Sequence, residues 1–288
     1  MIDIDYKSVL IDEPFEVYLA KKEEYLTSHE LRTFVKCPRE YYLRRIGALT
    51  ADPTKASTEL LIGSAAHKLI LEGRQEFDKC YAVGAPINPK TGHEYGRETQ
   101  AFAKWEEEQR REKGMNVEFL GTAQWYVVSS MADSVARHAE AQKLLHHGVA
   151  ERVLRSDFGG IPVQSRLDWF TQIGEVPVIV DLKTCSDLDS FEYDAKRFLY
   201  GLQTSFYRYI LLRSIFDEYD VDNAIPAKVF MIAVEKKAPF RCGVFEVSES
   251  TLGYFTEKIL ISIAALGNCQ KTGEFPTLYE SVRTLDLT

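Results

Sequence analysis

The sequence of 288 residues lacks the long apolar segments that membrane proteins and secreted precursors carry. No run approaches the roughly 20 consecutive apolar residues that a membrane-spanning helix needs. The first five residues, Met-Ile-Asp-Ile-Asp, are acidic, whereas a secretory signal peptide begins with basic residues and continues into an apolar stretch. We therefore expect a cytoplasmic protein that makes no contact with a membrane.

Cysteine is scarce, and no internal repeat or low-complexity stretch is evident. The five cysteines are an odd number and widely separated, at positions 37, 80, 185, 242 and 269. Closely spaced pairs would indicate a disulfide framework or a zinc site. The scattered pattern instead predicts reduced thiols in a cytosolic protein.

An excess of basic residues is also missing. Lys and Arg number 35 against 43 Asp and Glu, which gives a formal net charge of −8. Nucleic-acid-binding domains usually carry a basic surplus, so the overall charge does not indicate one. A local cationic stripe can nevertheless line a cleft of an acidic protein. The hydrophobic content of 45% is that of an ordinary folded protein and excludes a disordered chain.

The first half of the chain carries mainly helical patterns. Thr27 and Glu30 have the spacing of an N-terminal capping box, and Pro38 should divide the helix that follows them. Further helices are expected at 58–72, where Gly73 should end the helix, at 99–113, and at 122–147.

After residue 148 the pattern changes to an alternation of period two, which is typical of strands. Three successive strands are expected at 149–158, 161–171 and 176–184, joined by glycine-containing turns. The elements expected after them are a helix at 194–216, strands at 227–235 and 241–247, and a helix at 249–270. This order predicts an α/β fold in which helices flank a mixed central sheet.

The domain organisation follows from these patterns. Residues 1–25 form a charged lead-in segment, and 26–288 form a single domain. Within that domain, 26–148 is a mainly helical N-terminal elaboration and 149–288 is the α/β core.

Two carboxylates and one lysine are expected at one edge of the core sheet. Asp168 lies on the second strand of the core, and Asp181-Leu182-Lys183 follows a short apolar run on the third. Because side chains alternate along a strand, Asp181 and Lys183 point to the same face. Neighbouring carboxylates repel each other unless a cation binds between them, and hard divalent ions prefer oxygen ligands. Asp168, Asp181 and the backbone carbonyl of Leu182 are therefore candidate metal ligands, and Lys183 is a candidate partner of a phosphate or an attacking water.

Four further residues are candidates for the same site. Glu151 opens the first core strand, and His67 lies in the helix 58–72 beside the small residues of Gly63-Ser-Ala-Ala. Gln203 and Tyr207 are four residues apart and so share one face of the helix 194–216. Each position also has an ordinary structural explanation, because Asp-x-Lys triplets are common and a single histidine is more often a core residue. The joint order of these residues favours metal-assisted phosphodiester hydrolysis.

The combined pattern resembles the PD-(D/E)XK nuclease superfamily, in the branch of the RecE- and RecB-type exonucleases and their phage relatives. The matching pieces are Cys37-Pro-Arg-Glu-Tyr-Tyr42, Gly63-Ser-Ala-Ala-His67, Glu151, Arg166-Leu-Asp168, Asp181-Leu-Lys-Thr184, Gln203-Thr-Ser-Phe-Tyr207 and Val234-Glu-Lys-Lys-Ala-Pro239. The resemblance implies a restriction-endonuclease-like core and a site for two Mg²⁺ or Mn²⁺ ions. Carried over by position, it makes His67, Asp168 and Asp181 metal ligands and Lys183 catalytic. Glu151 becomes an active-site acid, and Gln203 and Tyr207 become accessory phosphate contacts.

Members of this branch that are similar to exonuclease VIII degrade one strand of duplex DNA from an end, 5′ to 3′. The 3′ tails that remain serve a single-strand annealing protein. These enzymes work as homo-oligomeric rings in the cytoplasm of bacteria or phage-infected cells. The resemblance thus implies double-stranded DNA ends, an annealing protein and further copies of the chain as partners. The residues expected to line such a channel are Arg32, Lys36, Arg39, Arg44 and Arg45, which could equally form a solvated helix face.

Some relatives in the superfamily hold an iron–sulfur cluster with one early cysteine and three clustered late ones. Here Cys37 is the early one, but only Cys242 and Cys269 occur late in the chain, so we expect no cluster. Two other functions stay open from the sequence. One is an endonuclease or defence-system nuclease on the same fold, and the other is a non-catalytic DNA-binding module.

Overall fold

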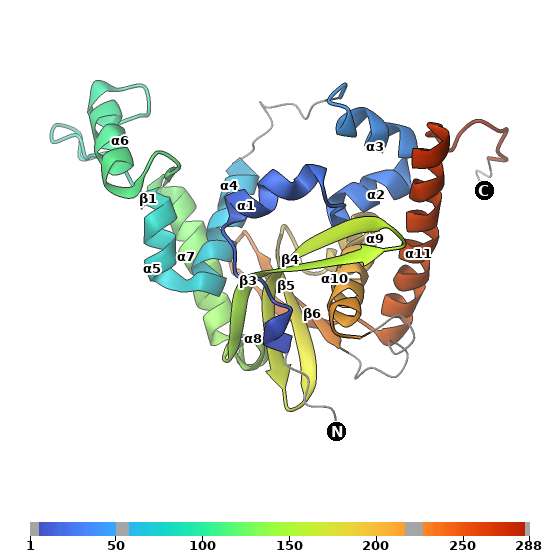
Figure 1. Ribbon diagram of the computed structural model, residues 1–288. Coiled ribbons are helices and arrows are strands. Elements are labelled where there is room, and N and C mark those ends of the chain that lie inside the picture. The colour runs from blue at the N-terminus through green and yellow to red at the C-terminus, as the bar shows by residue number, and fades with distance from the viewer. Residues whose placement is uncertain (1–5, 50–57, 217–226, 286–288) are drawn as a thin grey trace.

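The computed structural model describes residues 6–49, 58–216 and 227–285. Five strands of this part form a mixed sheet at the centre of the molecule, with the order β3-β4-β5-β6-β7 (Figure 1). The strands are β3 (Gly148–Phe158), β4 (Ile161–Ile173), β5 (Val176–Cys185), β6 (Lys228–Glu235) and β7 (Cys242–Glu246). Within this sheet the pair β5–β6 is parallel, and the other three neighbouring pairs are antiparallel. The predicted mixed α/β sheet is confirmed.

The central strand β5 is buried because both of its faces carry apolar residues. Val178 and Val180 belong to one apolar cluster, and Ile179 between them belongs to another. A strand that is covered on both sides reads as a continuous apolar run rather than an alternating one. This is the run that precedes Asp181, so the fold carries an acidic residue into the middle of the sheet.

Helices cover both faces of the sheet (Figure 1). On one face, α2 (Ser28–Lys36), α10 (Tyr200–Ile215) and α11 (Glu249–Thr272) pack against residues such as Leu154 and Ile179. On the other face, α4 (Thr58–His67), α7 (Thr122–Arg137) and α8 (Ala139–Leu145) pack against Val180 and Ile232. The remaining helices are α1 (Phe15–Ala20), α3 (Pro38–Arg45), α5 (Gly73–Cys80), α6 (Gln100–Lys113) and α9 (Phe191–Arg197). No helix of the described residues is long and apolar enough to cross a membrane.

The expected capping box is present. The Thr27 side chain accepts a hydrogen bond from the Glu30 backbone, and Glu30 in turn accepts one from the Thr27 backbone at 2.9 Å. Pro38 divides α2 from α3 as predicted.

Three helices that were expected to be continuous are divided instead. The helix 58–72 consists of α4 and a π-helical segment, Lys68–Glu72, and it ends at Gly73 (φ 84°) as predicted, where α5 begins. The helix 122–147 breaks at His138, whose extended backbone and Nδ1 acceptor cap α8. The helix 194–216 breaks at Leu199, which has left-handed backbone angles, φ 55°. Local capping and backbone conformation thus prevailed over the helical pattern at each break.

The first described residues lie along β3. Ile11 pairs with Val153 as an isolated antiparallel bridge, and Glu13 forms an ion pair with Arg155. The six residues of α1 then run between α4 and α2 (Figure 1). The elements β1 (Tyr81–Val83), α6 and β2 (Glu118–Leu120) form an arm that projects from the side of α5 and α7.

Gly148 opens β3 where a side chain has no room. A Cβ atom at this position would overlap the backbone oxygen of Phe170 and the indole of Trp169, whose Nε1 donates to the Leu144 carbonyl oxygen at 3.0 Å.

We predict that Gly148→Ala lowers the free energy of unfolding by about 1–3 kcal/mol, the usual cost of overpacking. Chemical denaturation measures the change. Gly253→Ala is the matched control: it lies in α11 with nothing within 4 Å of the added atom and should stabilise by about 0.5–1 kcal/mol. Equal effects of the two variants would contradict the prediction.

Candidate active site

Three acidic residues lie in one row across the sheet. The pairs Ala150–Trp169 and Arg152–Leu167 place Glu151 opposite Asp168. The pair Trp169–Val180 places Asp168 opposite Asp181, one step further along. Directly opposed residues of neighbouring strands are close together. The strand register on either side of the three acids predicted from the sequence therefore brings them near one another.

Asp181 is fully buried, and its two carboxylate oxygens accept no hydrogen bond of good geometry from any described residue. Its one charged contact is Lys183, whose Nζ lies 2.6 Å from Oδ2. Burial raises the pKa of Asp181, although the Lys183 ammonium opposes the rise. A buried carboxylate is costly even with one ammonium beside it, so this residue could also bind a metal cation.

The backbone of Leu182 and the side chains of Asp168 and His67 meet beside this pair. The Leu182 N–H donates to Asp168 Oδ2 at 2.8 Å, and His67 Nε2 lies 2.6 Å from the Leu182 carbonyl oxygen and 3.5 Å from Asp168 Oδ2. His67 Nδ1 faces the Gly63 carbonyl oxygen at 2.9 Å. Both ring nitrogens thus face acceptors, so an imidazolium satisfies the geometry.

The pKa shifts of this group agree with that geometry. Burial alone would lower the pKa of His67, but the hydrogen bond and charge of Asp168 outweigh it and raise the pKa to about 9. Burial alone would raise the pKa of Asp168, and the neighbouring His67 lowers it instead. His67 ends α4 immediately before the π-helical segment Lys68–Glu72, a distortion that is frequent at functional sites.

Glu151 has an unusual backbone for a strand residue, with φ 57° in the left-handed region. Such a conformation costs on the order of 1 kcal/mol or more in a residue with a Cβ, and it often occurs at functional sites. The Glu151 carboxylate lies 3.0 Å from Arg166 Nε. Burial and the nearby Asp168 charge together raise the pKa of Glu151 to about 7, against the opposing charge of Arg166. Its carboxyl group can therefore hold or release a proton near neutral pH.

Helix α10 contributes a polar face to the same site. Gln203 Nε2 donates to the hydroxyl of Tyr207 at 2.6 Å, as expected for residues four apart. Burial, and then the charges of Asp181 and Asp168, raise the pKa of Tyr207. Tyr200, one turn earlier, places its ring 5.2 Å below Lys183 Nζ.

Two clefts open beside these residues. The first, of about 920 Å³, is lined by Arg32, Arg44, Arg45, Gln203 and Tyr207 among others, and we call it the α2 cleft. The second, of about 610 Å³, is lined by His67, Glu151, Arg166, Leu182 and Lys183 among others, and we call it the α4 cleft. Phe15 of α1 lines both. The candidate site thus stands where a basic cleft and a cleft with the reactive groups adjoin.

The five basic residues predicted to bind DNA differ in their surroundings. Arg44 pairs with Glu40 at 2.8 Å and Arg45 pairs with Glu30 at 2.7 Å, so part of their charge is already neutralised. Arg32 donates to the Phe198 carbonyl oxygen at 3.1 Å and to His29 at 2.9 Å. Lys36 and Arg39 are exposed outside the α2 cleft, and the Arg39 guanidinium lies over the ring of Tyr42. Of the five, Arg32 is the residue best placed to offer its charge inside the cleft.

Sequence reasoning missed two residues of the site. Arg166 holds Glu151 and also covers the ring of Phe15, at 4.7 Å. The sequence signal for Arg166 was its position two residues before Asp168, in the Arg166-Leu-Asp168 motif. Tyr200 lies three residues before Gln203 and seven before Tyr207, which is the spacing of one helix face.

The donor atoms suit a divalent ion, although no group of three or more His, Cys, Asp or Glu side chains in the described residues is arranged to hold one as it stands. The oxygen atoms of Asp181, Asp168 and the Leu182 carbonyl are hard ligands. Here the Lys183 ammonium and the His67 imidazolium take the positions facing them. A bound ion would be held by these oxygens, with His67 and Glu151 beside it.

Comparison with known proteins agrees with this geometry. The family model that matches describes a PDDEXK-like domain of unknown function (DUF3799), and the match covers residues 28–288. The chain belongs to this PDDEXK-like family. Nucleases with PDDEXK domains generally use divalent metal ions, and membership therefore supports a nuclease with such an ion. The match begins just after the lead-in segment and includes every predicted site residue.

One solved structure shares the fold of this chain. A crystal structure from Eubacterium rectale, described as a "Putative exonuclease", superposes with a TM-score of 0.62 at 14% identity, over 96% of this chain and 97% of that one. The structure of the protein SSO0001 is 11% identical over 87% of this chain and 88% of that one, with a TM-score of 0.37, too low to support an argument. No curated protein matches the chain. At these identities, the first structure establishes a common fold alone.

We predict that Mg²⁺ or Mn²⁺ stabilises this PDDEXK-like protein through Asp181. A ligand that binds the folded state at about 100 times its Kd adds about 2.7 kcal/mol, which should raise the Tm by several degrees. Thermal unfolding with each ion, and again with EDTA, measures the shift. In Asp181→Asn the shift should be lost, whereas Glu175→Gln, an exposed change in the β4–β5 turn, should retain it. An unchanged shift in Asp181→Asn would exclude this residue as a ligand.

Proposed function

We propose that the chain is a Mg²⁺- or Mn²⁺-dependent DNA exonuclease that degrades one strand of linear duplex DNA. The observation that supports this most is the buried Asp181 carboxylate beside Lys183, which lines the α4 cleft. Buried reactive groups next to a basic groove suit a polyanionic substrate whose backbone must reach an ion. Family membership supports hydrolysis of a phosphodiester.

In this proposal each side chain of the site has a separate chemical role. An ion held by Asp168, Asp181 and the Leu182 carbonyl would polarise the scissile phosphate and activate a water molecule. Lys183 offers a positive charge at the same place, where it stabilises the charge that develops on the phosphate. Glu151, with its pKa of about 7, can take up a proton. Gln203 and Tyr207 face the α2 cleft and can donate hydrogen bonds to a neighbouring phosphate.

The finer properties extend the proposal by resemblance to the exonuclease VIII-type enzymes. We propose two metal ions, with His67 as a further ligand, and digestion from 5′ to 3′ that leaves 3′ tails. A single-strand annealing protein would receive these tails for recombination. The chain would act as a homo-oligomeric ring in the cytoplasm. Threading DNA through a ring would let an acidic protein present its positive charge only along the channel.

Dependence on a DNA end is the decisive test. Linear duplex labelled at either the 5′ or the 3′ end, and closed-circular duplex of the same sequence, are incubated with Mg²⁺. We expect early release of the 5′ label, slow loss of the 3′ label and an intact circle. Cutting of the closed circle would replace the exonuclease with an endonuclease on the same fold. Binding without any hydrolysis would leave a DNA-binding module.

Lys183→Ala should abolish hydrolysis, because it removes the charge beside the scissile phosphate. We expect a loss of at least about 10²-fold, as for removal of one electrostatic contact to a transition state. Rates of label release measure it, and gel shifts with Ca²⁺ test whether DNA binding is retained. Lys228→Ala is the matched control, because this exposed lysine at the start of β6 pairs with Glu246 on the surface. Normal rates in Lys183→Ala would refute the assigned role.

A further inference from the structure

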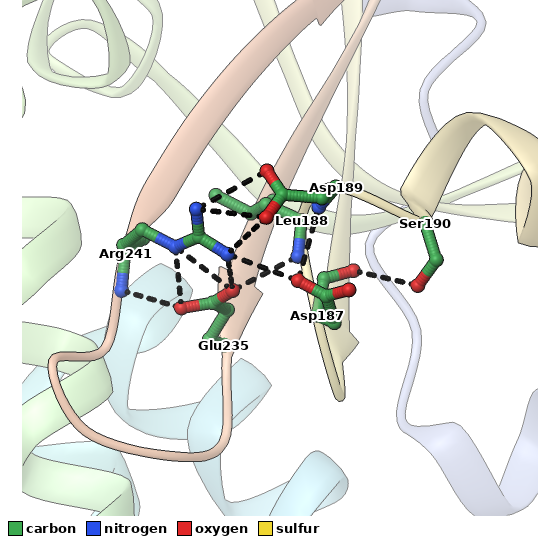
Figure 2. Close-up of polar contacts among 6 residues, drawn as sticks. All are labelled: Asp187, Leu188, Asp189, Ser190, Glu235 and Arg241. Atoms are coloured by element: carbon green, nitrogen blue, oxygen red, sulfur yellow. Dashed lines mark hydrogen bonds and ion pairs between the residues drawn. The ribbon is translucent and has the colours of Figure 1, made fainter.

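A second charged cluster stands just beyond the end of β5, the strand that carries Lys183. Arg241, just before β7, lies between Glu235 at the end of β6 and two aspartates, Asp187 and Asp189, of the loop after β5 (Figure 2). Its guanidinium contacts Glu235 at 2.6 Å, Asp187 at 2.9 Å and Asp189 at 3.2 Å. The cation that these three carboxylates hold is therefore Arg241 itself. None of the four residues belongs to the candidate active site.

Glu235 connects this cluster to the backbone of the loop. It is a buried residue, 4% exposed, and its Oε1 accepts a hydrogen bond from the Leu188 N–H at 2.9 Å, while Oε2 accepts one from the Arg241 N–H at 3.2 Å (Figure 2). Hydrogen bonds from Arg241 lower the pKa of Glu235, so it is ionised at neutral pH. Charge-assisted, bidentate contacts of this kind fix geometry more firmly than single hydrogen bonds. The loop from Asp187 to Ser190 is thereby held against the end of β6.

Strand register relates the cluster to the active site. Glu235 pairs with Cys185, and Ala233 pairs with Lys183. Because side chains alternate along each strand, Asp181, Lys183 and Cys185 share one face, and Ala233 and Glu235 of β6 lie on the same face. The charged cluster therefore lies directly beyond Lys183, on the same face of the sheet.

A small apolar cluster fills the space between. Its buried members are Cys185, Phe191, Met231 and Ala233, and Leu188, Tyr200, Phe245 and Val247 pack against them. Phe191 lies 5.0 Å from Phe245 and 6.2 Å from Tyr200, measured between ring centroids. The ring of Tyr200 in turn lies 5.2 Å below Lys183 Nζ. A continuous set of contacts thus leads from the fixed loop, through Leu188, to the ring beneath the ammonium.

We propose that Glu235 and Arg241 are positioning residues for Lys183, acting through the Leu188 loop and Tyr200. This inference rests on the proposed nuclease function, in which the rate of hydrolysis depends on the position of the Lys183 ammonium. Tyr200 limits the ammonium from one side by a cation–π contact, and Asp181 holds it from the other at 2.6 Å. Release of the loop would let Tyr200 withdraw and the ammonium move. A displacement of about 1 Å at a reacting group can cost up to about 10²-fold in rate.

The kinetic arm of the test uses Glu235→Gln, which keeps the shape of the side chain and removes its charge. We expect kcat for DNA hydrolysis to fall about tenfold while KM stays within about twofold, since the DNA-binding surface is untouched. Arg241→Lys keeps the positive charge but loses the bidentate guanidinium contacts, so it should give an intermediate loss of kcat. Glu246→Gln breaks an exposed ion pair on the same two strands and is the matched control, with unchanged kcat. An unchanged kcat in Glu235→Gln overturns the proposal.

The second arm observes Lys183 without DNA or activity. In protein labelled with ¹³C and ¹⁵N at lysine, the side-chain resonance that disappears in Lys183→Ala is that of Lys183. We expect its Hε signal to be shifted upfield by the Tyr200 ring, and this shift to vanish in Tyr200→Leu. In Glu235→Gln the shift should fall by about half or more, and in Glu246→Gln it should persist. A wild-type shift in Glu235→Gln overturns the positioning role.

The two arms separate the failure of the inference from the failure of the proposed function. If the wild-type protein does not hydrolyse DNA, the nuclease proposal fails, and the resonance of Lys183 still decides the positioning role. If Glu235→Gln does not fold, as judged by thermal unfolding, the double variant Asp187→Asn, Asp189→Asn replaces it. Both aspartates lie largely at the surface, so this variant removes two of the three partners of Arg241 without a buried change. The same loss of the ring shift is expected, and its retention overturns the proposal.

Discussion

The burial of the Asp181 carboxylate on the central strand is the constraint on which the site depends. Strand β5 is apolar on both faces up to Val180, and the next residue carries a charge into a place that water does not reach. Desolvation of a carboxylate costs several kcal/mol unless a cation or hydrogen bonds offset it. Lys183, two residues further on the same face, lies close enough to form an ion pair with it, at 2.6 Å. The fold therefore keeps a carboxylate whose need for a cation is only partly met.

The same reasoning extends to the neighbouring strand. Asp168 lies opposite Asp181 and would repel it, but His67 and the Leu182 N–H draw its charge toward α4. Two cationic side chains thus separate two acids that strand register has brought together. Asp168 and Asp181 could hold a divalent ion, whose charge would offset them as Lys183 and His67 do now, and His67 could join them as a ligand only through a deprotonated ring nitrogen. Metal binding and proton release are then expected to be linked.

The strands, the row of acids and the polar face of α10 could be predicted from the sequence, because each depends on local periodicity. Alternation of period two indicated β3 and β4, and the apolar run before Asp181 indicated β5, all with their ends within two residues. The spacing of Gln203 and Tyr207 predicted that they share a helix face, where they form a hydrogen bond. The π-helical segment Lys68–Glu72 and the breaks at His138 and Leu199 could not be predicted in this way, because they depend on local backbone conformations. Arg166, Tyr200 and Arg241 were missed for another reason: each acts through a partner that is distant in the sequence or on another element. The roles of the predicted site residues remain predictions, which the geometry permits.

The acidic residues also affect substrate binding, because some of them already pair with basic residues of the α2 cleft. Arg44 and Arg45 stand in the α2 cleft with their own acids, Glu40 and Glu30, whereas Arg32 contacts no carboxylate in the described part of the chain. A phosphate that entered the cleft would meet the Arg32 guanidinium, which has only uncharged partners among the described residues, and two guanidinium groups that already pair with carboxylates. Exchange of one anion for another costs little where both are exposed to water. Such a cleft would attract a polyanion weakly at a distance and bind it through contacts, which suits the exonuclease that we propose, because that enzyme would have to move along its substrate.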